Sequence, residues 1–406
     1  MERKYDLYSH DFRTRTYETF AEMREHDPVL LQGGLDETPI WFVSRYDDAV
    51  TVLMDDETFV RDVALAVDEQ DLAAFRAGLP ESLDFVENHM LNKDGDDHRR
   101  LRRLVSKAFT PRMIGSLRPR VQEIADELLD AVEDRGEMEL VDDFAFPLPI
   151  TVIAELLGIP AADRDRFREW SSSIVTPAFE PEDVARFTAL LDAFVAYLRD
   201  MFAERRANPR DDLTSALLQV EESGDTLSEQ ELYSMVVLLI VAGHETTVSL
   251  LGNAVLALLT HPAELERLAA DPGLVPEAVE ELIRYDGPVE RALTRWAATD
   301  TTLGGKTMKR GEPVVVVLGA ANRDRERFPA ADTLDVTRPP EGRHLGFGRG
   351  SHFCLGAPLA RLEAEVALTT LLRRLPGLRL VTPLEDLYWR PVPLFRSLAE
   401  LRVAWG

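Results

Sequence analysis

The sequence contains a single cysteine, which limits the disulfide bonds that it can form and the cellular compartments in which it is expected. One cysteine cannot form a disulfide within the chain, so a secreted, disulfide-stabilised protein has no support and a cytoplasmic protein is expected. Residues 1–15 are polar and charged and lack the apolar core of a signal peptide, so we expect no secretion signal.

Long apolar runs are scarce as well. The longest, residues 235–259, is interrupted near its centre by His244 and Glu245, which would be costly in lipid. The run therefore predicts a buried helix, and we expect no membrane anchor.

Basic residues are outnumbered by acidic ones. The chain has 46 lysines and arginines against 72 aspartates and glutamates, a formal net charge of -26. Such a surface repels nucleic acid and anionic membranes and favours solubility, so neither is expected as a partner. The 406 residues are 45% hydrophobic, enough to bury a sizeable core.

No repeat or sharp boundary divides the chain, and we predict one large, mainly α-helical domain, residues 1–406, with small β-sheets. Apolar residues recur at helical spacing in three stretches: 118–132, 184–202 and 360–375. Strand-like runs are short: 39–44, 301–303 and 313–318. Residues 322–356 show no clear period, and a long irregular stretch inside a compact domain is usually functional.

The cysteine lies in this irregular stretch, in Phe347-Gly-Arg-Gly-Ser-His-Phe-Cys354-Leu-Gly356. Glycines around it let the backbone adopt positive φ and approach a flat ligand closely. A helix predicted to follow, with Pro358 in its first turn, would direct backbone N–H groups towards a thiolate, and a thiolate is a good iron ligand. The alternative is an inert, buried cysteine, which the fixed spacing of six residues disfavours.

A second motif lies at the centre of a long predicted helix. Ser228-x-x-Glu231 is a capping box, and a helix from there to residue 259 would be about 45 Å long at about 1.5 Å per residue. Its centre reads Ala242-Gly-His-Glu-Thr-Thr247, and buried acid and hydroxyl groups need polar partners or water. This pattern suits a helix beside which a diatomic ligand binds and receives protons. The alternative is a packing glycine beside a locally bonded threonine. Val248 stands where a zinc peptidase would need its second histidine.

Both motifs resemble those of the cytochrome P450 family, and the resemblance covers essentially the whole chain. It implies the P450 fold, a heme b cofactor with Cys354 as its proximal iron ligand, and O2 as co-substrate. Thr246 and Glu245 would manage proton delivery during oxygen activation, and Gly243 would leave room for oxygen. The remaining heme-bordering residues would be Phe347, Ala242 and Gly356.

The resemblance also assigns charged residues. Glu281-x-x-Arg284 would form a structural triad with Arg338, whereas the similar Glu264-x-x-Arg267 is expected to be a solvated surface pair. Heme propionates need cations, and four residues match the family's propionate contacts: His98, Arg102, Arg295 and His352. A basic surface patch is the alternative explanation for the first two.

The expected substrate is a hydrophobic small molecule, because the stretches that match the family's pocket are mostly apolar. These stretches are 60–90, 174–179, 239–240, 289–293 and 394–395. Six residues represent the expected lining: Leu239, Ile240, Val289, Leu293, Leu394 and Phe395.

Arg99, Arg103 and Lys107 recur every four residues in a strongly acidic chain and predict a docking face for an acidic partner. Nothing in the chain reads as a flavin domain, so the partners expected are a ferredoxin and a ferredoxin reductase. The function expected is hydroxylation or epoxidation, in secondary metabolism. Two alternatives remain. A peroxide-using oxygenase of the same fold tends to replace the acid–threonine pair, and a non-enzymatic heme sensor would need neither that pair nor the docking face.

Overall fold

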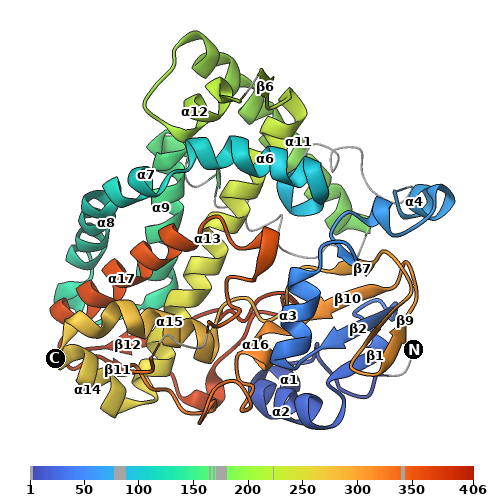
Figure 1. The fold of residues 1–406 in the computed structure, drawn as a ribbon. Helices are drawn as coiled ribbons and strands as arrows, with labels where there is room; N and C mark the ends of the chain where they lie inside the picture. The colour runs from blue at the N-terminus through green and yellow to red at the C-terminus, as the bar shows by residue number, and fades with distance from the viewer. Residues whose placement is uncertain are drawn as a thin grey trace.

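The computed structural model describes residues 3–76, 88–163, 166–167, 170, 181–222, 224–339 and 343–406. Helices dominate this part of the chain, and the largest of its small sheets lies to one side of them (Figure 1), so the prediction of a mainly α-helical fold with small β-sheets is confirmed. Residues 174–179 of the predicted pocket lie outside the described residues, as do 77–87 of the stretch 60–90.

The elements follow in chain order. The principal helices are α1 (His10–Thr14), α2 (Thr16–His26), α3 (Tyr46–Met54), α4 (Glu69–Arg76), α6 (Gly95–Ala108), α7 (Pro111–Ser116), α8 (Arg118–Asp130), α9 (Pro147–Leu156), α11 (Pro181–Ala207), α12 (Leu213–Gln219), α13 (Glu229–Leu259), α14 (Pro262–Ala270), α15 (Val275–Asp286), α16 (Leu318–Ala321) and α17 (Ala357–Arg374). The strands are β1 (Val29–Gly33), β2 (Pro39–Val43), β3 (Phe59–Val60), β4 (Glu137–Glu139), β5 (Glu221–Glu222), β6 (Asp225–Thr226), β7 (Arg295–Ala297), β8 (Thr301–Leu303), β9 (Lys306–Met308), β10 (Pro313–Val316), β11 (Arg379–Leu380) and β12 (Arg402–Ala404).

Helix α13 runs through the middle of the helical part of the molecule (Figure 1) and packs against α9, α15 and α17. The predicted capping box is present: Ser228 accepts a hydrogen bond from the Glu231 N–H, and the Glu231 carboxylate accepts one from the Ser228 N–H. The helix is long and apolar enough to cross a membrane, but 67% of its most apolar window is buried inside the protein. The prediction of a buried helix is therefore confirmed.

A five-stranded sheet, in the order β1-β2-β10-β7-β3, contains two of the predicted strands as neighbours. Val314 of β10 lies opposite Trp41 of β2 in a parallel pair. The predicted strand 313–318 was too long, since β10 ends at Val316. From Leu318 the chain turns into α16, where the Ala321 N–H donates to the Val317 carbonyl instead of to a neighbouring strand. The third predicted strand, β8, forms a hairpin with β9.

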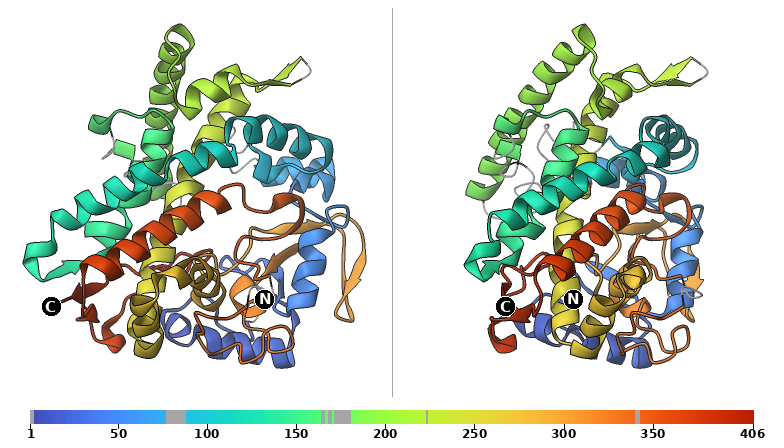
Figure 2. Two further views of the ribbon diagram at one scale, coloured as in Figure 1. Left: turned by 60° about the vertical axis from the view of Figure 1, so that its left-hand side comes forward. Right: turned by 90° about the vertical axis from the view of Figure 1, so that its left-hand side faces the viewer.

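The irregular segment 322–356 leads directly into α17. Within its described residues, the longest regular element is a three-residue 3-10 turn, Gly350–His352. Helix α17 then packs against α8, α13 and α15, and it runs alongside α8 in both views of Figure 2. The cysteine loop is thereby fixed to the helical core by the helix that follows it.

Candidate functional site

Cys354 lies three residues before α17, in a loop closed on itself. Its N–H donates to the Phe347 carbonyl at 2.9 Å, and Gly348 and Gly350 adopt the positive φ values of 70° and 77° that the glycine pattern suggests. A Cβ on Gly350 would lie 2.5 Å from the Leu53 carbonyl oxygen in α3, so this close approach requires glycine.

Cys354 is exposed at its surface, but protein atoms surround most of its thiol. Desolvation by these atoms raises the pKa of the thiol, whereas the N–H groups of Gly356 and Ala357 and the charge of Arg102 lower it. The sulfur is thus directed at hydrogen-bond donors that stabilise a thiolate, as expected ahead of a helix N-terminus.

The four predicted propionate contacts form one cationic cluster. The His98 and His352 rings lie 4.2 Å apart between centroids, and the charges of Arg102 and Arg295 act on these rings. Burial, together with the nearby His352 and Arg102, lowers the pKa of His98 to about 4. His98 is 3% exposed, so the surface-patch explanation is wrong for this residue.

Two ring nitrogens in this cluster, His98 Nε2 and His352 Nδ1, are buried without a hydrogen-bond partner. Buried polar atoms normally have partners. A carboxylate placed here would favour protonation of both rings, whose N–H groups could then donate to it, and would balance the charges of Arg102 and Arg295. The residues therefore fit the propionates of a heme. Arg295 now bonds Asp56 at 3.1 Å and the Phe59 carbonyl at 2.7 Å.

Asp94, which sequence reasoning missed, orients this cluster. Its Oδ2 accepts the N–H groups of Arg61 and Asp62 at 2.6 and 2.7 Å, and its Oδ1 lies 3.4 Å from His352 Nε2. The only signal in the sequence is an aspartate directly before the start of α6. The contact leaves His352 Nδ1 as the unpartnered nitrogen of the ring.

The central motif of α13 presents two different sides. The Thr246 hydroxyl donates to the Ala242 carbonyl at 3.0 Å, and Ala242 is exposed. Gly243 faces the other way, because a Cβ there would lie 3.2 Å from the Ile153 side chain of α9. The small size of Gly243 therefore suits the packing of α13 against α9, and its predicted role of leaving room for oxygen stays a prediction.

Glu245 is buried and held by a residue far away in the sequence. Its Oε2 accepts a hydrogen bond from Arg390 Nη1 at 3.0 Å, and its Oε1 lies 3.6 Å from His244 Nε2. Burial raises the pKa of Glu245, but the contacts with His244 and Arg390 outweigh it, and the net pKa is below the ordinary value. Nothing in the sequence indicated Arg390. Glu245 and Thr246 therefore have separate hydrogen-bond partners.

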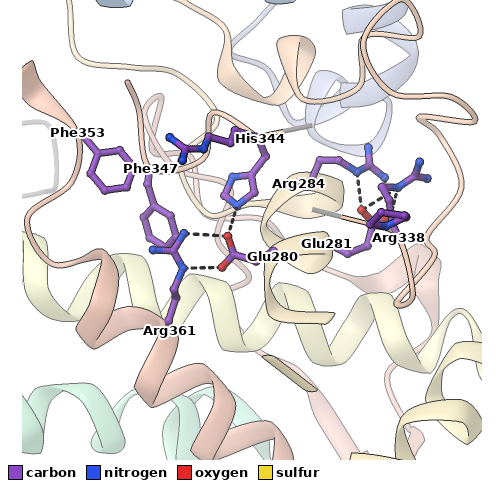
Figure 3. Close-up of a pocket in the computed structure, with 10 residues that line it drawn as sticks. Glu280, Glu281, Arg284, Arg338, His344, Phe347, Phe353 and Arg361 are labelled. Carbon is purple, nitrogen blue, oxygen red and sulfur yellow. Dashed lines mark hydrogen bonds and ion pairs between the residues drawn. The ribbon is translucent and has the colours of Figure 1, made fainter. Parts of the chain in front are cut away.

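The structure brings Glu281, Arg284 and Arg338 together, as Figure 3 shows. Glu281 accepts two hydrogen bonds from Arg284, at 2.6 and 2.8 Å, and both of its oxygens accept from Arg338 Nε. The remaining guanidinium N–H groups donate to backbone carbonyls of residues 322–333. This ion pair joins α15 to the irregular segment. The expected surface pair Glu264–Arg267 differs, because Glu264 also accepts the Val336 N–H at 2.9 Å.

A second charged group, missed by sequence reasoning, lies beside the triad on the same cavity of about 500 Å³ (Figure 3). Glu280 accepts hydrogen bonds from Arg361 at 2.6 and 2.8 Å and lies 3.1 Å from His344. The Arg361 guanidinium lies over the Phe347 ring, 4.5 Å from its centroid. This group joins α15, α17 and the cysteine loop.

The predicted pocket residues separate into two sets. Val289 and Phe395 pair in an isolated β-bridge, and the Leu394 carbonyl accepts the Glu290 N–H at 3.0 Å. Segments 289–293 and 394–395 therefore lie side by side, and Leu293 is 40% exposed. Leu239 and Ile240 instead lie within the hydrophobic core, whereas their neighbours Leu238 and Val241 are only partly buried.

The fold, and the position of a thiol beside a cationic cluster, fit the class of heme-thiolate proteins. A sequence model of the family described as Cytochrome P450 matches residues 164–271 and 273–376. The chain is 44% identical over 403 residues to a protein named Cytochrome P450 from Bacillus subtilis (strain 168), covering 98% of this chain and 96% of the relative. It is also 44% identical over 388 residues to Mycinamicin IV hydroxylase/epoxidase of Micromonospora griseorubida, covering 95% of this chain and 94% of the relative.

Among solved structures, the chain is similar to the myxobacterial cytochrome P450 CYP267B1 in complex with myristic acid. The TM-score is 0.92 at 46% sequence identity, and the match covers 98% of both chains. The chain belongs to the cytochrome P450 family and acts as a monooxygenase.

Proposed function

We propose that this protein is a ferredoxin-dependent monooxygenase in which Cys354 ligates the iron of heme b. The observation that carries the proposal is the orientation of the Cys354 thiol towards the N-terminal N–H groups of α17, next to a cationic cluster with two unpartnered ring nitrogens. When bound, a thiolate-ligated heme supplies the chemistry that activates O2.

The residues of the chain would hold this group from several elements. His98 and Arg102 of α6, Arg295 of β7 and His352 of the cysteine loop would bind the propionates. Phe347 and Gly356 would border the heme on the cysteine side, and Ala242 would border it from α13. These elements are distant in sequence, so heme binding would depend on the intact fold.

The proposed substrate is a hydrophobic small molecule that is hydroxylated or epoxidised in secondary metabolism, in the cytoplasm. Support comes from the apolar side chains of Val289, Leu293, Leu394 and Phe395, because the two segments that carry them lie together. One relative is named for the hydroxylation and epoxidation of mycinamicin IV, and a similar structure holds myristic acid. Glu245 and Thr246 would manage proton delivery from α13, with Arg390 holding the Glu245 carboxylate.

A Thr246→Ala variant tests the oxygenase mechanism. With NADH, ferredoxin and its reductase, the parent enzyme should couple oxygen uptake to product formation. The variant should keep consuming NADH but divert electrons to hydrogen peroxide, because its proton-delivering hydroxyl is gone. General acid–base groups contribute about 10²–10⁴-fold, so product per NADH should fall at least about tenfold.

The control is Thr260→Ala, which removes a hydroxyl with the same i−4 bond at the end of α13 and should leave coupling unchanged. An unchanged ratio of product to NADH in Thr246→Ala would contradict the assignment. A parent enzyme that oxidises substrate only with peroxide would favour the peroxide-using alternative, and one that takes up no oxygen would favour a heme sensor.

The exposed side of α6 is proposed as the ferredoxin-docking face. Arg99, Arg103 and Lys107 are exposed, while His98 on the opposite side is buried in the cationic cluster. Arg99 also forms an ion pair with Asp96 at 2.6 Å, which reduces its contribution to a positive surface. Arg103 and Lys107 lie about one and two turns further along the same exposed side of α6, and they are the positions chosen for the test.

Reversing both charges, Arg103→Glu with Lys107→Glu, should slow reduction by an acidic ferredoxin and flatten its dependence on salt. Exposed charges act mainly on association rate and are screened over about 8 Å at physiological ionic strength. Stopped-flow reduction at several salt concentrations measures this. Heme content should stay normal. A parental rate at low salt, or loss of heme, would refute docking at this face.

A further inference from the structure

We infer that Glu280 and Arg361 form a charge pair that sets the reduction potential of the heme, acting through the thiolate of Cys354. The inference rests on the proposed ligation by Cys354. Arg361 would raise the potential, and Glu280 would offset that effect while fixing the place of the guanidinium.

Two hydrogen bonds and a ring contact hold the Arg361 guanidinium in place. Arg361 Nε and Nη2 donate to the two Glu280 oxygens at 2.6 and 2.8 Å, a bidentate arrangement that only arginine can make. The same guanidinium lies over the Phe347 ring at 4.5 Å, and the Phe347 carbonyl accepts the backbone N–H of Cys354. Figure 3 shows Arg361 between Glu280 and this ring. The charge is therefore fixed next to the residue that closes the cysteine loop.

The charge of Arg361 acts on the sulfur. The pKa of Arg361 is raised, first by its hydrogen bond with Glu280 and to a smaller extent by the negative charge of a Cys354 thiolate. The side chains of Arg361 and Glu280 are only 32% and 30% exposed, so water screens the interaction less than at an open surface.

The sign of the effect follows from charge. Reduction adds one electron to the heme, so a nearby positive charge favours the reduced state and a negative charge disfavours it. Arg361 is better suited to this test than Arg102, the other arginine whose charge acts on Cys354, because Arg102 is also a proposed propionate contact. Arg361 has its own counterion, so both members of the pair can be neutralised separately.

The test is a redox titration of heme-loaded variants. Arg361→Gln should lower the midpoint potential, because the positive charge is removed and Glu280 keeps only its contact with His344. Glu280→Gln should raise it, because glutamine keeps the shape of the side chain but not its charge. The double variant should return towards the parental potential, and Arg361→Lys, which keeps the charge, should stay near it.

Arg374→Gln is the matched control. It removes an arginine from the same helix, 13 residues and therefore about 20 Å further along, and should leave the potential unchanged. Shifts of opposite sign in the two single variants support the inference, since a purely structural role would not reverse sign. Single variants that shift in the same direction, or not at all, would overturn it. If the parent enzyme lacks the thiolate band of its reduced carbon-monoxide complex, the proposed ligation itself fails, and the inference fails with it.

Discussion

A Cys354→Ser variant should lose the red-shifted Soret band of the reduced carbon-monoxide complex, and monooxygenase activity with it. The chain has no other cysteine that could replace the ligand. A thiolate pushes electron density that favours cleavage of the O–O bond, and a hydroxyl cannot do so at neutral pH. The expected effect is complete loss of the band, measured by difference spectroscopy on protein reconstituted with heme.

Two further variants make this result interpretable. Cys354→His offers a ligand that still binds iron, so heme should be retained while the band moves away from the thiolate position. Ser351→Ala removes a hydroxyl without a hydrogen-bond partner from the same loop and should keep the parental band. A Cys354→Ser protein that retains the band would show that another group ligates the iron.

Glu281→Gln should produce the largest loss of stability, about 3–5 kcal/mol in the free energy of unfolding. Glu281 is the shared counterion of Arg284 and Arg338, and both partners in its bidentate pair with Arg284 are about 2% exposed in their side chains. Without the carboxylate, two guanidinium charges remain in a poorly solvated place. Whole domains are stable by about 5–15 kcal/mol, so the loss should be visible in urea unfolding and in the heme-to-protein ratio.

The matched control for this variant is Glu264→Gln. Glu264 belongs to the same Glu-x-x-Arg pattern, but its partner Arg267 is 48% exposed in its side chain. An ion pair with so exposed an arginine contributes about 0–1 kcal/mol. The Glu264 side chain is itself 14% exposed, but glutamine keeps an oxygen that can accept the Val336 N–H, so this variant should lose much less stability than Glu281→Gln. Equal losses in the two variants would show that burial of the Glu281 pair does not matter.

The sequence alone determined features that depend on near neighbours in the chain. The capping box of α13 requires only Ser228 and Glu231, and the positive φ of Gly348 and Gly350 reflects the absence of a side chain. The central helix was recognised as buried because polar residues interrupt its apolar run. The motif around Cys354 was equally local, and its resemblance to a known family indicated the charged residues that converge on it.

Only the tertiary structure decided which charges meet. Glu245 pairs with Arg390 across 145 positions, Arg361 with Glu280 across 81, and His352 faces Asp94 across 258. The sequence contains many more acidic and basic residues than these pairs use, so it does not indicate which of them pair. Which two lie within hydrogen-bond reach depends on how α13, α15 and α17 pack.

The same reason explains how the residues of α13 are oriented within the predicted site. Residue type and spacing indicated that Gly243 and Ile240 belong to a functional helix, but not which side of that helix each occupies. Packing against α9 turned Gly243 towards Ile153, and the core enclosed Ile240 while Ala242 stayed exposed. Helix α13 is apolar around most of its circumference and so carries little amphipathic signal. Its orientation is therefore fixed by the helices around it and not by its own sequence.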